Sequence, residues 1–206
     1  MTCALALTAL IAFQVSTSEV LVKILYGTPG ILIGLGLVEL ALVVILSWAI
    51  NKMSAAVATI MFFTYAALNG ATLAVIFLKF SPGSIAVTFF VTAGTFAAMS
   101  IYGFVTKSDL TKWGNLLLMA LLGIVIASVV NFFLVNNILS WIISCIGVIV
   151  FVGLTAYDTQ KIKEMFYEFN EGSEEYIKFA VIGALILYLD FINLFLSLLK
   201  FLGRRN

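Results

Sequence analysis

Long runs of apolar residues recur along the whole chain and are separated by short polar breaks. A helix that crosses the hydrocarbon core of a bilayer needs about 20 predominantly apolar residues, and seven runs approach or exceed that length. Turn residues occupy the breaks, as in Gly27-Thr28-Pro29. We therefore predict seven transmembrane helices, over residues 1–15, 29–50, 53–78, 84–105, 115–135, 138–166 and 176–202.

The first of these segments is the shortest, and it begins at Met1 with no basic residue beside it. A signal peptide is the rival interpretation, but it would carry a charged amino-terminal region and an Ala-x-Ala type of cleavage site. Neither is present, so we expect a transmembrane helix that is either truncated or preceded by native residues which this start omits.

Composition supports a membrane protein, because 63% of the 206 residues are hydrophobic and only 10% are charged. Soluble domains are about 45 to 50% apolar and about 25% charged. We predict an all-α fold, with one transmembrane domain over residues 1–206 and the lipid bilayer as its partner. The net charge of +1 and the absence of any block of like charge give no indication of a nucleic-acid partner.

Histidine is absent from the sequence, which removes the commonest general base and the commonest zinc ligand. The two cysteines, Cys3 and Cys145, stand alone in apolar runs and suggest neither a disulfide framework nor a metal site. We therefore expect no enzymatic activity and no bound cofactor.

Basic residues predict the orientation, because cytoplasmic loops carry an excess of lysine and arginine. In the seven-helix arrangement one side receives Lys52, Lys107, Lys112, Lys161, Lys163 and Lys178. The opposite side holds Lys23 and Lys79 in its loops and Lys200, Arg204 and Arg205 in the tail. The basic residues of the tail make the two sides nearly equal in number of basic residues. The loops alone still predict a cytoplasmic amino terminus and an external carboxyl terminus.

Three acidic residues, Glu39, Asp158 and Asp190, lie within predicted spans. An ionised carboxylate in the middle of a membrane helix costs about 2.5 to 3.5 kcal/mol on insertion scales, so an intramembrane acid indicates a functional site by default. Asp190 shares one helical face with Asn193 and Ser197, at i+3 and i+7. Lipid cannot satisfy such a polar stripe, so we expect it to face the bundle interior or water.

Asp158 lies toward the cytoplasmic end of the preceding span, and the short connecting loop predicts that the last two helices are antiparallel neighbours. Two carboxylates in a poorly solvated site cannot both ionise cheaply, so a pair that meets can share one proton. Raising the pH would remove the proton, separate the helices by repulsion and expose two oxygen ligands to a cation such as calcium. In the alternative, each aspartate only caps a buried network of Tyr, Thr or Asn groups. Glu39 is either a cation waypoint in a pore or a protonated acid bonded between helices.

Four segments of the sequence carry a family pattern: LYLDFINLF over residues 187–195, AYDTQKI over 156–162, FFVTAGTF over 89–96 and SDL over 108–110. With these segments the chain resembles bacterial members of the transmembrane Bax inhibitor motif family. The resemblance extends from the second predicted span to the end of the chain. A nine-residue block around a membrane aspartate is a specific signal.

The resemblance implies a seven-helix fold of the bacterial inner membrane, in which the last helix is central and wrapped by the other six. The family is associated with pH-sensitive calcium leak and, in eukaryotes, with suppression of cell death. Asp158 and Asp190 match its paired aspartates, which close the path when they share a proton, and we expect them to bind calcium transiently. Glu39 matches a glutamate linked to ion passage, and Asn193 and Ser197 are expected to continue the path.

Two features depart from some relatives. Bacterial relatives can carry an arginine after the second helix that latches onto the first aspartate, whereas this chain offers Lys52, which lacks the bidentate fork of arginine. Lys52 is a possible latch or only a positive-inside anchor. The last loop also looks longer, and it is either an entry vestibule or a solvated turn. Its acidic residues are Glu168, Glu171, Glu174 and Glu175.

Two other functions compete with the leak. An intramembrane aspartyl protease also places Tyr-Asp on one helix and an aspartate on the next, but the second acid here follows Tyr188-Leu189 instead of Gly-x-Gly, and no Pro-Ala-Leu sequence follows it. The second rival is a non-conducting membrane protein that regulates a protease or a survival complex by binding it.

Overall fold

The computed structural model describes residues 1–167 and 172–204, and the regular elements among them are all helical. In chain order they are α1 (Thr2–Thr17), α2 (Glu19–Gly27), α3 (Pro29–Ala49), a 3-10 turn (Ile50–Lys52), α4 (Ala55–Leu73), α5 (Val75–Lys79), α6 (Pro82–Val105), α7 (Thr111–Leu134), α8 (Asn137–Phe166) and α9 (Glu174–Leu202). The prediction of an all-α chain is confirmed for these residues.

Within the described part of the chain, six segments are long and apolar enough to cross a membrane. They are α3 with the 3-10 turn, α4 with α5, α6, α7, α8 and α9. A seventh span results only if α1 and α2, which meet at a bend of 97°, are counted together. The seven-span count therefore stays a prediction.

The predicted span over residues 53–78 is divided at Ala74, where α4 ends and α5 begins. The hydroxyl of Tyr26 on α2 accepts a hydrogen bond from the Val75 N–H at 2.9 Å and donates to the Ala71 carbonyl at 2.7 Å. Backbone groups freed inside a membrane helix need such a substitute partner. A side chain from a distant helix therefore stabilises the break, which the hydropathy pattern does not predict.

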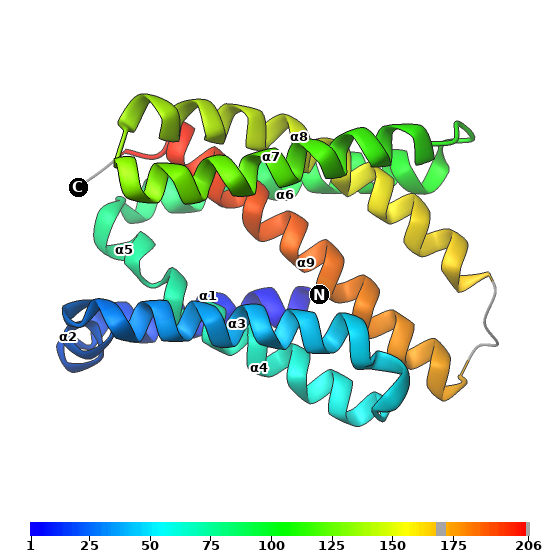
Figure 1. The fold of residues 1–206 in the computed structure, drawn as a ribbon, viewed down its shortest axis with the longest axis horizontal. Helices are drawn as coiled ribbons and strands as arrows, with labels where there is room; N and C mark the ends of the chain where they lie inside the picture. The colour runs from blue at the N-terminus through cyan, green and yellow to red at the C-terminus, as the bar shows by residue number, and fades with distance from the viewer. Residues whose placement is uncertain (168–171, 205–206) are drawn as a thin grey trace. The chain divides into compact units, whose positions relative to one another are not determined.

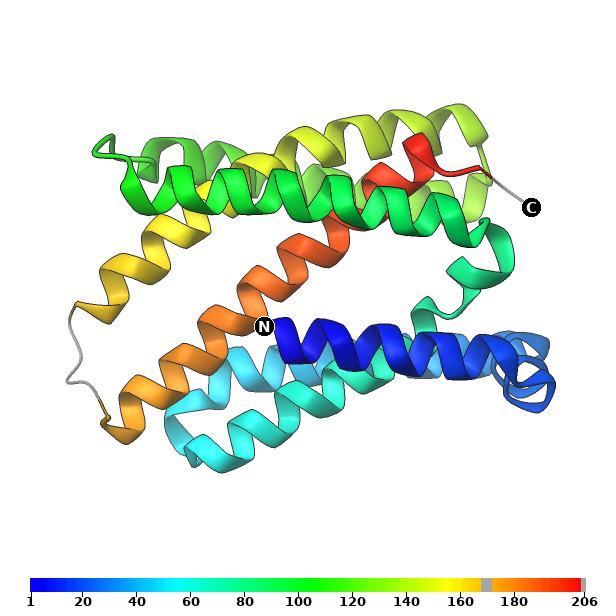
Figure 2. The same ribbon diagram turned by 180° about the vertical axis from the view of Figure 1, so that it is seen from behind.

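The helices form two compact units, and α9 contributes to both. The first unit contains α1 to α5 and residues 174–188 of α9, and the second contains α6 to α8 and Leu189–Arg204. In the first unit, α1 and α3 each pack along α4 (Figures 1 and 2). Glycine permits the contact of α1 with α4, because a Cβ on Gly70 would lie 2.7 Å from the Thr8 carbonyl oxygen.

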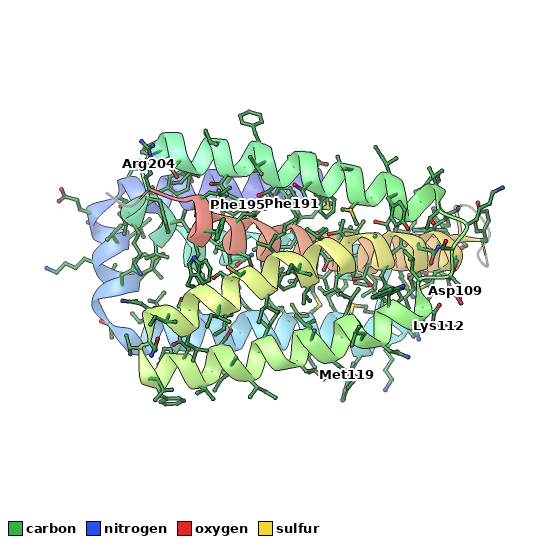
Figure 3. All side chains as sticks on the ribbon, turned by 90° about the horizontal axis from the view of Figure 1, so that it is seen from above. Asp109, Lys112, Met119, Phe191, Phe195 and Arg204 are labelled. Carbon is green, nitrogen blue, oxygen red and sulfur yellow. The ribbon has the colours of Figure 1, made fainter. Side chains whose placement is uncertain are left out.

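The second unit is built on α8, which packs against both α6 and α7 (Figure 1). Its core contains Leu110, Val150, Phe151, Leu154, Ala156, Tyr157, Leu194 and Leu198. On α9, Phe191 contacts Phe89 and Phe96 of α6 edge to face, with ring centroids 5.6 and 5.4 Å apart. Figure 3 labels Phe191 and Phe195 on this part of α9. Aromatic and branched side chains thus fix α9 between α6 and α8 beside Asp190.

The outer faces of these helices are apolar. On α7, Met119 projects outward and is 70% exposed (Figure 3). Trp113 and Phe132 near the two ends of the helix are also exposed. Such side chains are expected to contact lipid, which takes the place of a protein partner along a membrane helix.

Candidate functional site

The side chains of Asp158 on α8 and Asp190 on α9 hydrogen-bond to each other within the second unit. A bond between two carboxyl groups requires one of them to carry the proton that is donated. Asp190 is only 5% exposed, and its Oδ2 atom has no hydrogen-bond partner among the described residues. Proton sharing between the two acids stays a prediction.

Close packing against two glycines holds the part of α8 that precedes Asp158. The Tyr157 ring lies against Gly114 on α7, where a Cβ would come within 2.3 Å of the ring. The Ala156 carbonyl lies against Gly103 on α6, where a Cβ would come within 2.2 Å of the oxygen. These contacts immediately precede Asp158 in the chain, so glycines on two neighbouring helices allow α8 to approach both of them at the level of the acid.

The charged group that acts on Asp158 from its own helix is Lys161, one turn further on, whose ammonium also lies 5.7 Å from the centroid of the Tyr157 ring. Lys52, the predicted latch, is exposed in the 3-10 turn of the first unit. An ion pair among the described residues joins Lys178 to Glu174 at 3.6 Å, and it does not involve Lys52. A latch at Lys52 stays a prediction.

Asn193 and Ser197 follow Asp190 along α9 as the spacing predicts, but their polar atoms are already occupied. The Asn193 side-chain amide donates to the Leu189 carbonyl at 2.8 Å, and the Ser197 hydroxyl donates to the Asn193 carbonyl at 2.8 Å. Both bonds stay within α9 and satisfy the side chains locally. A role of these residues in ion passage stays a prediction.

Glu39 lies on α3 in the first unit, where the Thr72 hydroxyl of α4 donates a short hydrogen bond to it. It also interacts electrostatically with the tyrosines Tyr65 and Tyr188. Glu39 and the aspartate pair belong to different units. The structure therefore places Glu39 in a second polar cluster, and its part in an ion path stays a prediction.

The centre of this second cluster is the hydroxyl of Tyr188, a residue that is fully buried. The Asn69 amide donates to it at 2.9 Å, and it lies 2.7 Å from the Thr8 hydroxyl oxygen. Thr8 has a single hydroxyl proton, for which the carbonyls of Ala66 and Ala4 are acceptors at 2.8 and 2.9 Å. Tyr188 must therefore donate to Thr8, which makes a directed chain of bonds that joins α9, α4 and α1.

Sequence reasoning did not select Thr8, Asn69 or Gln160. Asn69 carries the clearest signal, because an amide within a long apolar run needs a partner in the bundle. Gln160 lies in the AYDTQKI segment, where the family resemblance implies no role for it.

Two hydrogen bonds define which loops share an end of each unit. The Ala55 N–H bonds to the Glu174 carboxylate at 3.1 Å, so the turn with Lys52 and the start of α9 lie at one end of the first unit. The Arg204 N–H bonds to the Ser84 hydroxyl at 2.9 Å in the second unit. Both agree with the predicted alternation of the spans. The predicted loop residues Glu168 and Glu171, and Arg205 in the tail, lie outside the described residues.

Comparison with known proteins finds similarity along the whole chain. The family model described as "Bax1-I: Inhibitor of apoptosis-promoting Bax1" matches residues 1–206. Inner membrane protein YbhL of Escherichia coli K12 is 52% identical over 207 aligned positions, which cover 100% of this chain and 88% of YbhL.

Relatives from other bacterial lineages are also similar over most of their length. A protein of Borreliella burgdorferi is 44% identical, with 100% of this chain and 89% of the relative covered. A membrane protein of Streptococcus pyogenes is 41% identical, with 91% and 81% covered. With the apolar helices described above, these matches establish an integral membrane protein. The chain belongs to the Bax inhibitor family.

Proposed function

We propose that this protein is a pH-sensitive cation leak of the bacterial inner membrane, with calcium as the permeating ion. The observation that carries the proposal is the hydrogen bond between the half-buried carboxyl group of Asp158 and the buried carboxyl group of Asp190 on adjacent helices. A buried acid pair within membrane helices is a costly feature, and such features mark ion or proton pathways by default. The resemblance to the Bax inhibitor family points the same way.

The proposed gate works through the proton that the two acids share. With the proton present, the pair is an attractive contact that fastens α8 to α9. When a rise in pH removes it, two carboxylates face each other in surroundings of low polarity, where like charges repel strongly. The helices then separate at this level, and water and a cation enter between the carboxylates.

Calcium fits the proposal as a passing ion and not as a resident one. Calcium takes six to eight oxygen ligands, and the pair supplies only carboxylate oxygens from two residues. Within residues 1–167 and 172–204, no cluster of three or more His, Cys, Asp or Glu side chains could hold a metal. Weak binding is what a conducting site needs, because the ion must also leave.

The remaining features belong to the same proposal. We place Glu39, Asn193 and Ser197 along the path, and Lys52 as a latch that steadies the closed state. We propose seven spans, a last helix at the centre of the bundle, a cytoplasmic amino terminus and an external carboxyl terminus. The printed name of the Escherichia coli relative, an inner membrane protein, supports the location.

Calcium flux into proteoliposomes, measured across a series of pH values, tests the proposal. We expect flux to rise with pH in the wild type, and the pH dependence to be lost in Asp158→Asn and Asp190→Asn. Glu19→Gln is the matched control, because this acid is exposed at the start of α2 in the first unit and should leave the profile unchanged.

Pure protein that passes no calcium at any pH would refute the leak. It would favour a non-conducting regulator of a membrane protease or survival complex, whose aspartates hold the core together. Cleavage of a membrane peptide that depends on both Asp158 and Asp190 would favour the aspartyl protease instead.

A further inference from the structure

The α6–α7 loop, residues 106–110, has no regular structure and is hydrogen-bonded to α8 through the side chain of Gln160. The Gln160 Oε1 atom accepts a hydrogen bond from the Leu110 N–H at 2.9 Å, and its Nε2 atom donates to the Ser108 carbonyl at 2.9 Å. Gln160 is 9% exposed, so water does not readily replace these bonds. Leu110 precedes the first turn of α7, where a backbone N–H has no partner within the helix.

Other side chains near Gln160 on α8 also contact α6 and α7. Tyr157 fills the space that Gly114 leaves on α7. Lys163 donates to the Phe104 carbonyl at 2.7 Å, in the last turn of α6, and its ammonium lies 4.9 Å from the Phe104 ring centroid. The end of α6, the loop and the start of α7 therefore all bond or pack against one segment of α8, residues 156–163.

Asp158 lies on this segment, and its position relative to Gln160 is informative. Two residues advance about 200° around an α-helix, so side chains at 158 and 160 leave α8 on nearly opposite sides. Asp158 reaches Asp190 on α9, whereas Gln160 reaches the loop. The loop thus contacts the side of this α8 turn that lies opposite Asp158.

We propose that Gln160 is a positioning residue for the aspartate pair, which it serves by fixing the α6–α7 loop against the α8 turn that bears Asp158. The inference rests on the function proposed above. Released from the loop, this end of α8 is free to shift, and the carboxyl groups lose their bonding geometry. A looser pair binds its shared proton less tightly, because the hydrogen bond weakens and the repulsion between the two carboxylates falls as they move apart.

Other charged groups do not explain such a change. Asp190 and Lys161 act electrostatically on Asp158. The further charged or titratable side chains on the segments packed here are Tyr102 on α6, Lys107 and Asp109 in the loop, Lys112 on α7, and Tyr157 and Lys163 on α8. Substituting Gln160 by a neutral residue leaves all of them in place.

The test compares Gln160→Met, which keeps the length and removes both hydrogen bonds, with Thr159→Val on the same helix. Among residues 1–167 and 172–204, the Thr159 hydroxyl bonds only to the Thr155 carbonyl of α8, so its loss leaves the loop attached. Infrared absorption of protonated carboxyl groups follows the pair without any transport assay, and the band that disappears in Asp158→Asn identifies it. Hydrogen exchange over residues 106–112 reports whether the loop is released.

We expect the midpoint of the carboxyl band to fall by about half to one pH unit in Gln160→Met, the size that one or two ordinary hydrogen bonds correspond to. Thr159→Val should leave it within about 0.2 unit. The pH profile of calcium flux should shift with the band. If Gln160→Met does not fold, Gln160→Asn, which retains the amide but is one methylene shorter, takes its place.

A released loop with an unchanged midpoint would overturn the inference, because Gln160 would then only fasten the loop. A wild-type protein whose pair shows no titrating band would overturn it as well. A wild-type band that titrates in a protein without calcium flux refutes the leak alone, and the shift in Gln160→Met then still supports the positioning role.

Discussion

Replacing Tyr188 by phenylalanine removes one oxygen atom from a bond chain that joins three helices. The hydroxyl accepts from Asn69 on α4 and donates to Thr8 on α1, and no part of the residue is exposed. The ring should stay in place, because it packs edge to face on Phe62 and Tyr65, with centroids 5.8 and 5.7 Å away. The substitution therefore tests the hydrogen bonds and little else.

The size of the effect follows from what the lost oxygen leaves behind. A hydrogen bond between membrane helices contributes on average about 0.6 kcal/mol and at most about 1.7 kcal/mol. Two such bonds are lost, and the Asn69 amide keeps a buried N–H without its acceptor. Thr8 retains its carbonyl acceptors, so its share of the cost is smaller. We expect Tyr188→Phe to lower the free energy of unfolding by about 1 to 2 kcal/mol.

Equilibrium unfolding in mixed micelles, followed by circular dichroism, measures this difference. Tyr65→Phe is the matched control, because Tyr65 packs on the same ring and its hydroxyl makes no hydrogen bond within the described residues. In the Thr8→Val background the Tyr188→Phe effect should shrink, since the two residues share a bond. A loss of less than about 0.3 kcal/mol in Tyr188→Phe, or one equal to that of Tyr65→Phe, would refute the bond chain as a source of stability.

Three further substitutions test particular contacts. Gly103→Ala places a Cβ 2.2 Å from a carbonyl oxygen of α8 and should cost about 2 kcal/mol or more in thermal unfolding, whereas Gly94→Ala, with no atom within 4 Å of the added carbon, should be neutral or stabilising. Val135 ends α7 in the left-handed region at φ 49°, so Val135→Gly should stabilise the protein by about 1 kcal/mol. Hydrogen bonds from Thr111 hold the pKa of Asp109 below its ordinary value of 3.8. The Asp109 carboxylate should therefore stabilise the start of α7 at neutral pH, and this stabilisation should be lost as the pH falls below that value. Hydrogen exchange at the start of α7 should become faster at low pH in the wild type and should not change in this way in Asp109→Asn.

The sequence was most informative where one physical rule decides the outcome. Length and apolarity placed α8 at residues 138–166, against Asn137–Phe166 in the structure, because a membrane helix must satisfy its backbone internally. It was least informative where a distant side chain intervenes. The break at Ala74 depends on the Tyr26 hydroxyl, and the early start of α7 at Thr111 accompanies the hydrogen bond that the Leu110 N–H donates to the Gln160 side chain.

The candidate site divides in the same way. Adjacency along the chain predicts only that Asp158 and Asp190 can approach, since a short loop leaves antiparallel helices few other arrangements. Their role as a gate stays a prediction. The partners of Tyr188 were out of reach, because Thr8 lies 180 positions away along the chain. Periodicity gave Asn193 the correct face but not its local bond to Leu189, which depends on the rotamer that the side chain adopts.

In the proposed leak, the local bonding of Asn193 and Ser197 limits how calcium passes the aspartate pair. Asn193 and Ser197 each donate to a carbonyl of their own helix, which leaves the amide and hydroxyl oxygens as the atoms able to face an ion. Ser197 lies seven residues beyond Asp190, about 10 Å along the helix axis, which is too far for it to bind the same ion. The two carboxylates and the Asn193 amide then supply at most five oxygens, fewer than the six to eight that calcium takes, so water must complete its shell. A partly hydrated ion needs a wide opening, and the tightly packed helices at Gly103 and Gly114 resist one. Opening must therefore separate α9 from α8 and leave the packing of α8 on α6 and α7 intact, which is the arrangement that the Gln160 contact with the loop would preserve.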